Sequence, residues 1–218
     1  MVGFLRCSGR LSEAVPHFWP QQTNRTDPNQ GSTSGTNSIT LEKRMVRLYD
    51  FHTDMGQAWI AWQDPGDTVV EIGLPGTFSP EVIDRYRRRH GESIQFVRST
   101  SDEDIVHAVQ SYFSGRKVVS FPFWHRLGFG SMTESRIRVL HAVYAIPYGR
   151  TRSYSSIASE VGKPAAGRFV GNTMAANPFP VIIPCHRVIR KDGSLGGFGG
   201  GIALKRRMLE MEQQVVAS

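Results

Sequence analysis

The pattern of apolar residues changes at Gly130, and this change limits the folds that the chain can adopt. Before Gly130, short β-branched or aromatic runs are bounded by Asp, Gly and Pro turns, which is typical of strands. The expected strands cover residues 46–51, 58–63, 68–72 and 93–97. Helices are expected at 79–89, where Ser79-Pro80-Glu81 is a start signal, and at 101–113. The sequence therefore predicts an α+β domain over residues 45–125.

After Gly130 the apolar residues recur at helical spacing. Helices are expected at 131–148, at 153–161, and from Lys163-Pro164 to just before Asn177-Pro178. The short turn between the second and third of these helices has helix-turn-helix spacing. The third helix is rich in Ala and Gly, which let a backbone approach either DNA or another helix closely. These helices belong to a second domain, residues 130–218. Spacing alone does not decide whether its third helix approaches DNA or packs against another helix.

Residues 1–44 differ from the rest of the chain. The run from Gln21 to Thr40 consists almost entirely of Gln, Thr, Asn, Ser, Gly, Asp and Pro, with almost nothing to bury. Such composition predicts a disordered N-terminal extension. Met45 opens the first strand, and we expect it to be the natural start of the protein. Native protein whose N-terminal peptide lies upstream of Met45 would contradict this expectation.

Composition excludes several classes of protein. No stretch approaches the roughly 18 uninterrupted apolar residues of a membrane helix. The two cysteines, Cys7 and Cys185, exclude a disulfide-dense scaffold and a zinc site built from cysteines. So few cysteines fit a reducing compartment, and the sequence therefore predicts a cytoplasmic protein. No clustered metal-ligand spacing is present, so no metal is expected, although His and carboxylate side chains alone leave zinc open; no cofactor is expected either.

The net charge of +7 is confined to one part of the chain. Residues 130–218 hold 12 Lys/Arg and 5 Asp/Glu, a balance of +7, whereas residues 1–129 hold 14 of each. A basic segment of this kind favours a polyanionic partner such as DNA. Charge alone also allows a plain solvated basic surface.

The segment from Asn177 to Ile189 surrounds Cys185 with unusual constraints. Three prolines fix φ and keep the residues before them extended, so the approach to the cysteine is stiff. His186 and Arg187 follow directly, and we expect their charge to lower the pKa of the thiol. Contact between adjacent side chains needs a turn or a bridging water there. The alternative is a buried structural cysteine beside a hydrogen-bonded histidine.

The segment Ile183-Pro184-Cys185-His186-Arg187-Val188 resembles the active-site motif of the O6-alkylguanine-DNA alkyltransferases. The resemblance covers residues 131–213, including the stretches 146–154, 168–172 and 193–201 and the pair Lys205 and Glu212. It implies a ribonuclease-H-like N-terminal domain followed by a winged-helix-like helix-turn-helix domain. It also implies a monomer that moves the alkyl group of O6-alkylguanine to its own cysteine once, irreversibly, with O4-alkylthymine as a further candidate substrate.

The resemblance assigns a role to each catalytic residue. Cys185 would be the alkyl acceptor, and His186 would take the thiol proton through a water. Glu212 would orient the imidazole, as the third member of a triad does. Tyr154 would donate its hydroxyl hydrogen to the departing guanine, and Asn177 would orient the site by hydrogen bonds.

The resemblance also implies a double-stranded DNA partner, bound in its minor groove with the damaged base flipped out. Arg168 would fill the vacated position in the base stack, with Ala165 and Ala166 close to the DNA. Phosphate contacts would come from Arg136, Arg138, Arg150, Arg152, Lys163 and Arg190. The base pocket would be formed by Phe198, where many members have Tyr, Gly199, where some have Ser, and Val188.

Two rival functions belong to other classes. A non-catalytic lesion-binding module would bind alkylated DNA and leave the lesion intact. A cysteine hydrolase using Cys185 and His186 would turn over small esters or amides without DNA, and the basic helix-turn-helix counts against it.

Overall fold

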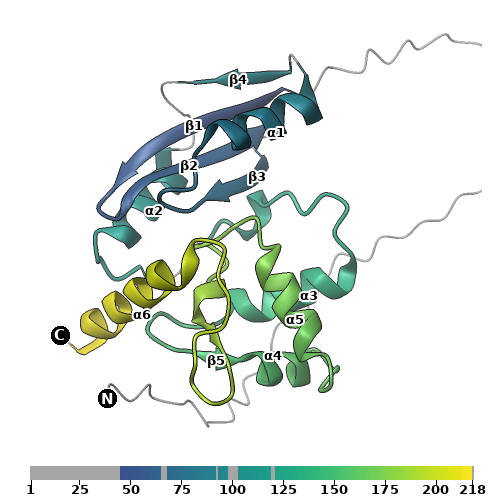
Figure 1. Ribbon diagram of the computed structural model, residues 1–218, viewed down its shortest axis with the longest axis vertical. Helices are drawn as coiled ribbons and strands as arrows, with labels where there is room; N and C mark the ends of the chain where they lie inside the picture. The colour runs from purple at the N-terminus through teal and green to yellow at the C-terminus, as the bar shows by residue number, and fades with distance from the viewer. Residues whose placement is uncertain (1–44, 65–67, 92, 98–102, 119–120, 218) are drawn as a thin grey trace, which may run out of the picture. The chain divides into compact units, whose positions relative to one another are not determined.

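The computed structural model describes residues 45–64, 68–91, 93–97, 103–118 and 121–217. The predicted extension 1–44, which contains Cys7, lies outside the described residues. The first half contains the strands β1 (Val46–Thr53), β2 (Gly56–Gln63), β3 (Thr68–Gly73) and β4 (Ile94–Phe96), with the helices α1 (Pro80–His90) and α2 (Glu103–Phe113) (Figure 1). The strands and helices predicted for this half are confirmed, with boundaries that differ by at most two residues; the predicted helix start at 101–102 lies outside the described residues.

The sheet has the order β3-β2-β1-β4, in which β1 to β3 are antiparallel and β4 runs parallel to β1. Residues 58–62 of β2 are all buried because the sheet is covered on both faces. Trp59 and Ala61 pack with Tyr86 of α1, whereas Ile60 and Trp62 belong to the core that includes Ile105 of α2. Because side chains alternate between the two faces of a strand, the single apolar run of β2 contributes to the hydrophobic clusters on both faces of the sheet.

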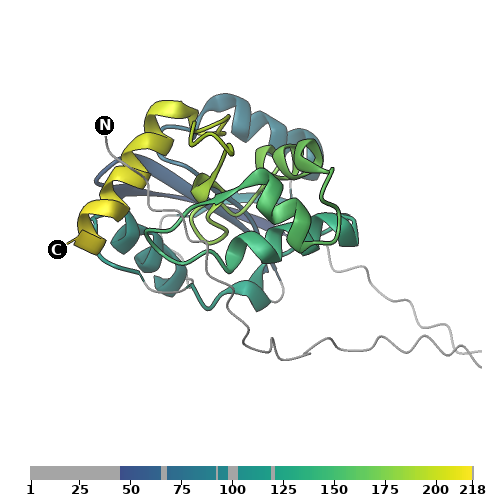
Figure 2. The same cartoon turned by 90° about the horizontal axis from the view of Figure 1, so that it is seen from below.

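The second half contains four helices and a two-stranded parallel pair. The helices are α3 (Glu134–Tyr144), α4 (Tyr154–Glu160), α5 (Gly167–Ala175) and α6 (Gly201–Ala217), and the strands are β5 (Arg152–Ser153) and β6 (Val188–Ile189). Figure 2 shows α6 on the side opposite α4 and α5. The described residues include no helix long and apolar enough to cross a membrane.

Two predicted helices were too long. The helix predicted over 131–148 ends at Tyr144, because Pro147 opens a turn closed by the Arg150 N–H to the Pro147 carbonyl at 3.1 Å. The helix predicted from Lys163-Pro164 begins only at Gly167. A turn closed by the Ala166 N–H and the Lys163 carbonyl, 2.8 Å apart, precedes it. Both differences come from local turns that compete with the helix.

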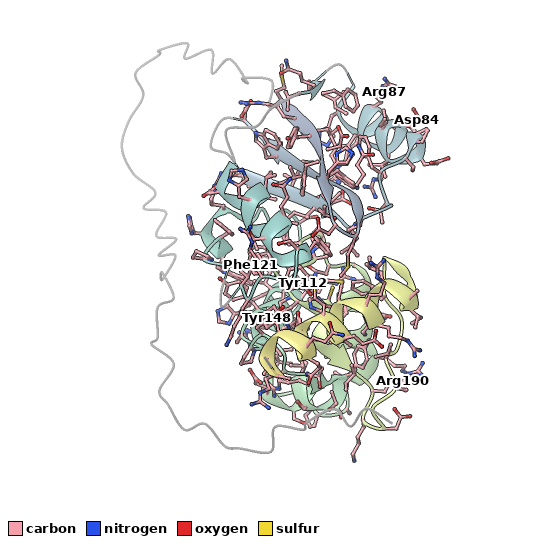
Figure 3. The ribbon with its side chains drawn as sticks, turned by 90° about the vertical axis from the view of Figure 1, so that its left-hand side faces the viewer. Asp84, Arg87, Tyr112, Phe121, Tyr148 and Arg190 are labelled. Atoms are coloured by element: carbon pink, nitrogen blue, oxygen red, sulfur yellow. The ribbon has the colours of Figure 1, made fainter. Side chains whose placement is uncertain are left out.

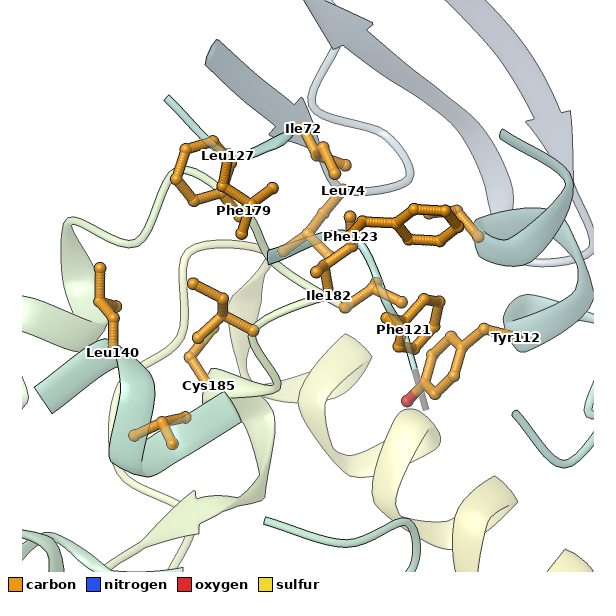
Figure 4. Packing of buried hydrophobic residues seen from close by; sticks show 14 of the residues in the cluster. Ile72, Leu74, Tyr112, Phe121, Phe123, Leu127, Leu140, Phe179, Ile182 and Cys185 are labelled. Atoms are coloured by element: carbon orange, nitrogen blue, oxygen red, sulfur yellow. The ribbon is translucent and has the colours of Figure 1, made fainter. Parts of the chain in front are cut away.

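One hydrophobic core extends through both halves. Ile72 and Leu74 at the end of β3 belong to the same buried cluster as Phe179 and Ile182, which precede Cys185 (Figure 4). The Ile72 N–H also donates to the Pro178 carbonyl at 2.7 Å. The segment that leads to the cysteine therefore rests against the sheet, and the sheet helps to fix its position.

Candidate active site

The stiff approach to Cys185 contains a strained residue. Val181 has φ of 75° although it is β-branched, and it is 1% exposed. Such a conformation costs of order 1–3 kcal/mol and persists only where the surroundings impose it. The turn around it is closed by the Ile183 N–H, which donates to the Phe179 carbonyl at 2.8 Å.

Asn177 holds the two ends of this turn. Its Nδ2 donates to the Ile183 carbonyl at 2.9 Å, and its Oδ1 accepts from the Phe179 N–H at 3.0 Å. The side chain thus replaces backbone partners on both sides of Val181. This placement is compatible with the predicted orienting role of Asn177.

Cys185 begins a short 3₁₀ turn, η2 (Cys185–Arg187), and is 5% exposed. Burial raises the pKa of its thiol, while a hydrogen bond with Asn177 and the charge of Lys205 act in the opposite direction. The expectation that the charges of His186 and Arg187 would lower this pKa was wrong, because the turn directs both side chains toward Glu212; His186 lowers it through a backbone hydrogen bond instead. The resting site therefore favours the neutral thiol.

Glu212, on α6, is the centre of a buried hydrogen-bond network and is 0% exposed. Its Oε1 accepts from His186 Nε2 at 2.7 Å and from Tyr112 Oη at 2.8 Å. Its Oε2 accepts from the Gly149 N–H at 2.9 Å and from Arg187 Nε at 3.0 Å. Burial alone would raise the pKa of Glu212, but His186 and Arg187 lower it to about 2. The carboxylate is therefore ionised at neutral pH.

His186 is fully buried and has two different ring nitrogens. Nε2 faces Glu212 and the hydroxyl of Tyr112, at 2.7 and 3.0 Å. Nδ1 is buried and has no hydrogen-bond partner among the described residues. Burial lowers the pKa of the imidazole, although the Glu212 carboxylate opposes this effect. A neutral ring with a free Nδ1 can accept a proton.

Arg187 and Tyr112 were not predicted as site residues. Arg187 is 5% exposed, and its guanidinium donates to Glu212 and, through Nη1, to the Ile146 carbonyl at 2.7 Å. Its guanidinium carbon also lies 5.4 Å from the ring centre of Tyr148. A charged residue inside the otherwise buried apolar run 181–189 was the signal that could have identified it, because a buried charge needs a partner.

Lys205, also on α6, is buried between the site and the glycine loop. Its Nζ donates to the carbonyls of Val188, at 2.7 Å, and Leu195. Burial lowers the pKa of the ammonium to about 8, and the nearby Cys185 opposes that shift. Lys205 thus joins β6 to the loop after it and places a cation near the thiol.

Gly149 allows α6 to approach the site. Its φ is 71°, and a Cβ there would lie 2.5 Å from Val216 Cγ2. We expect Gly149→Ala to lower the free energy of unfolding by about 2–4 kcal/mol, since it adds left-handed strain and a clash. Adding Val216→Ala, at a position 46% exposed, should restore the part due to the clash. Urea denaturation measures both; a double variant no more stable than Gly149→Ala would contradict this account.

A pocket of about 600 Å³ opens onto Cys185. Its wall combines α5, the start of α4 and the glycine loop, with lining residues that include Tyr154, Arg168, Cys185, Phe198 and Gly199. Tyr154 packs against the loop so closely that a Cβ on Gly196 would lie 3.0 Å from its hydroxyl oxygen. Arg190, predicted as a phosphate contact, lines the same pocket, so six of the predicted site residues meet at one cavity.

The other predicted binding residues lie outside that lining. Val188 is buried in β6, where its carbonyl accepts from Lys205. Arg150 is exposed, and Lys163 is exposed with its Nζ 3.1 Å from Ser135 Oγ. Arg152 forms an ion pair with Glu160. Ala165 and Ala166 lie in the turn before α5. Among the described residues, no three His, Cys, Asp or Glu side chains are grouped to hold a metal ion.

Comparison with known proteins assigns this fold and site to a class of DNA-repair proteins that accept alkyl groups. Residues 134–214 match the family model described as the 6-O-methylguanine DNA methyltransferase, DNA binding domain. The inducible methylated-DNA--protein-cysteine methyltransferase of Bacillus subtilis is 48% identical over 147 residues, which cover 67% of this chain and 79% of that protein. The relative from Methanothermobacter thermautotrophicus is 50% identical over 86 residues, about half (48%) of its length.

Solved structures agree with these matches. The crystal structure of Mycobacterium tuberculosis O6-methylguanine methyltransferase has a TM-score of 0.63 and 32% identity, covering 78% of this chain and 94% of that one. The structure of the M. tuberculosis protein in complex with DNA has a TM-score of 0.64 and 31% identity. The chain belongs to the methylated-DNA--protein-cysteine methyltransferase family.

Proposed function

We propose that this protein repairs DNA by transferring the alkyl group from O6-alkylguanine to the sulfur of Cys185. One observation carries the proposal: the buried thiol lies at the wall of a pocket and is followed directly by His186, whose Nε2 is bound to the ionised Glu212. A nucleophile, a base and a group that orients the base are the components of nucleophilic catalysis.

The reaction is a displacement at carbon. The thiol proton passes through a water to Nδ1 of His186, and the new imidazolium is stabilised by Glu212. The thiolate attacks the alkyl carbon, an S–C bond forms, and the bond between that carbon and guanine O6 breaks. The departing guanine keeps the bonding electrons and is stabilised by a hydrogen bond from Tyr154, which keeps its own proton because burial raises its pKa. The guanine anion then takes a proton from water, and the imidazolium of His186 releases the thiol proton to water. A thioether is not readily reversed, so each molecule acts once.

The helix-turn-helix would present this pocket to DNA. Arg168 is exposed near the start of α5 and lines the pocket, so it can occupy the stack position of a base flipped into the cavity. The small residues of α5 suit a close approach in the minor groove. Arg150, Arg152 and Lys163 would contact phosphates, with Arg152 exchanging Glu160 for the DNA. The M. tuberculosis relative in complex with DNA supports this partner.

The finer description of the fold is part of the same proposal. Three antiparallel strands followed by β4 parallel to β1 support a ribonuclease-H-like N-terminal domain, residues 45–125. The helix-turn-helix with the pair β5–β6 supports a winged-helix-like domain, residues 130–218. The two domains would act as one unit, since their core is continuous, and the protein is proposed to act as a monomer.

Intact mass spectrometry tests the function directly. After incubation with a duplex that carries O6-methylguanine, we expect a gain of one methyl group per protein, saturating at one. Peptide mapping should place the methyl group on the peptide that contains Cys185. Binding of the duplex with unchanged mass would refute the transfer and support a lesion-binding module instead.

A further inference from the structure

The active-site network includes a residue from the N-terminal half. Tyr112 lies on α2 and its side chain is fully buried. Its ring packs against Phe113, Phe121 and Tyr148, with centroid separations of 5.1, 6.3 and 6.2 Å. Figure 3 labels Tyr112, Phe121 and Tyr148 in this region. These contacts direct the hydroxyl toward α6 (Figure 4). There it lies 2.8 Å from Glu212 Oε1 and 3.0 Å from His186 Nε2.

The positions of the hydrogen atoms follow from these distances. The ionised Glu212 can only accept, so the single hydroxyl hydrogen of Tyr112 is donated to Oε1. Neither Glu212 nor Tyr112 then has a hydrogen left for His186 Nε2, which must itself donate. Its N–H is shared between Glu212 Oε1 at 2.7 Å and the hydroxyl oxygen of Tyr112 at 3.0 Å. A neutral His186 consequently carries its hydrogen on Nε2.

We propose that Tyr112 is a positioning residue for the alkyl transfer, holding the ring of His186 in the orientation in which the unprotonated Nδ1 is directed away from Glu212. The inference rests on the proposed function, in which Nδ1 receives the thiol proton. The ionised Glu212 fixes the hydrogen on Nε2, but a single acceptor leaves the ring able to turn about that hydrogen bond, and Oε1 also accepts from Arg187. The second acceptor, fixed by a packed aromatic ring, supplies that restraint. The N-terminal half therefore takes part in the chemistry.

The test is Tyr112→Phe, which keeps the ring and removes the hydroxyl. Tyr86→Phe is the matched control, because Tyr86 is also buried in this half and donates to a carboxylate, Glu71 Oε2, at 2.8 Å. Two quantities are measured: the single-turnover rate of methyl transfer from an O6-methylguanine duplex, and the ¹H–¹⁵N spectrum of the histidine rings, in which the shift and exchange rate of the His186 Nε2–H report its hydrogen bonds.

In Tyr112→Phe we expect the rate of transfer to fall about tenfold to one hundredfold, as for the loss of a hydrogen bond to a charged or reacting group. His186 should keep its hydrogen on Nε2, but the Nε2–H signal should shift upfield and exchange faster with water, while Tyr86→Phe leaves both quantities unchanged. An unchanged Nε2–H signal in Tyr112→Phe would overturn the inference, as would a loss of rate equal to that of Tyr86→Phe. A wild-type protein without transfer would refute the proposed function, and the spectra would still decide whether Tyr112 holds the His186 ring.

Discussion

Cys185→Ala will accept no methyl group from O6-methylguanine DNA but will bind the same duplex with nearly the wild-type affinity. The substitution removes the only atom that forms the new bond and leaves Arg168 and the helix-turn-helix in place. It deletes one small buried atom, so the loss of stability should be about 1 kcal/mol. Intact mass spectrometry and a mobility-shift assay on the same duplex measure the two properties.

Cys7→Ala is the matched control, since Cys7 is the other cysteine of the chain. It should gain one methyl group per molecule at the wild-type rate. Methyl transfer by Cys185→Ala would show that the acceptor is elsewhere and would refute the proposed mechanism. Turnover of small esters by the wild-type protein, lost in Cys185→Ala, would instead favour the hydrolase.

Glu212→Gln should lower the free energy of unfolding by about 3–5 kcal/mol, the range found when one partner of a buried ion pair is removed. The neutral amide leaves the guanidinium of Arg187 buried without a counter-charge, at a position 5% exposed. Glu210→Gln changes the same residue type on the same helix at an exposed position and should alter stability by no more than about 0.5 kcal/mol. Urea denaturation of both variants at neutral pH measures the difference.

The effect of Glu212→Gln should depend on pH. The pKa of Glu212 falls from 4.5 to about 2 on folding, so its ionisation stabilises the folded state fully above the unfolded pKa. This contribution, about 3 kcal/mol, is lost as the pH falls from 4.5 toward 2. The stability gap between wild type and Glu212→Gln should therefore narrow as the pH is lowered from 5 to 3. A gap that stays constant over this range would show that Glu212 is not the titrating group.

Local patterns were enough to predict the strands of the sheet and the order of the helices. The short β-branched or aromatic runs of β1 and β2, bounded by turn residues, and the Ser79-Pro80 start signal depend on neighbouring residues only. The motif around Cys185 likewise identified a set of residues that the fold brings together. Tyr112 could not be found this way, since it lies 74 positions before His186 and meets it only through the packing of α2.

The pKa of Cys185 shows where reasoning from adjacent residues fails. Arg187 is two positions away in the sequence, but the 3₁₀ turn commits its charge to Glu212. The cation that acts on the thiol is Lys205, which comes from α6 and is visible only once the chain is folded. The pKa of the thiol depends on its burial and on its distance in space from charged groups, and separation along the sequence gives neither.

The burial of Cys185 has a consequence for the lifetime of a protein that works once. A thiol that is 5% exposed, and whose pKa burial raises, reacts slowly with oxidants and small electrophiles. General thiol reagents encounter a neutral, buried sulfur. A nucleobase bound in the pocket lies next to the same sulfur, and His186 is there to accept the thiol proton. The thiol of Cys185 therefore stays unmodified until damaged DNA binds.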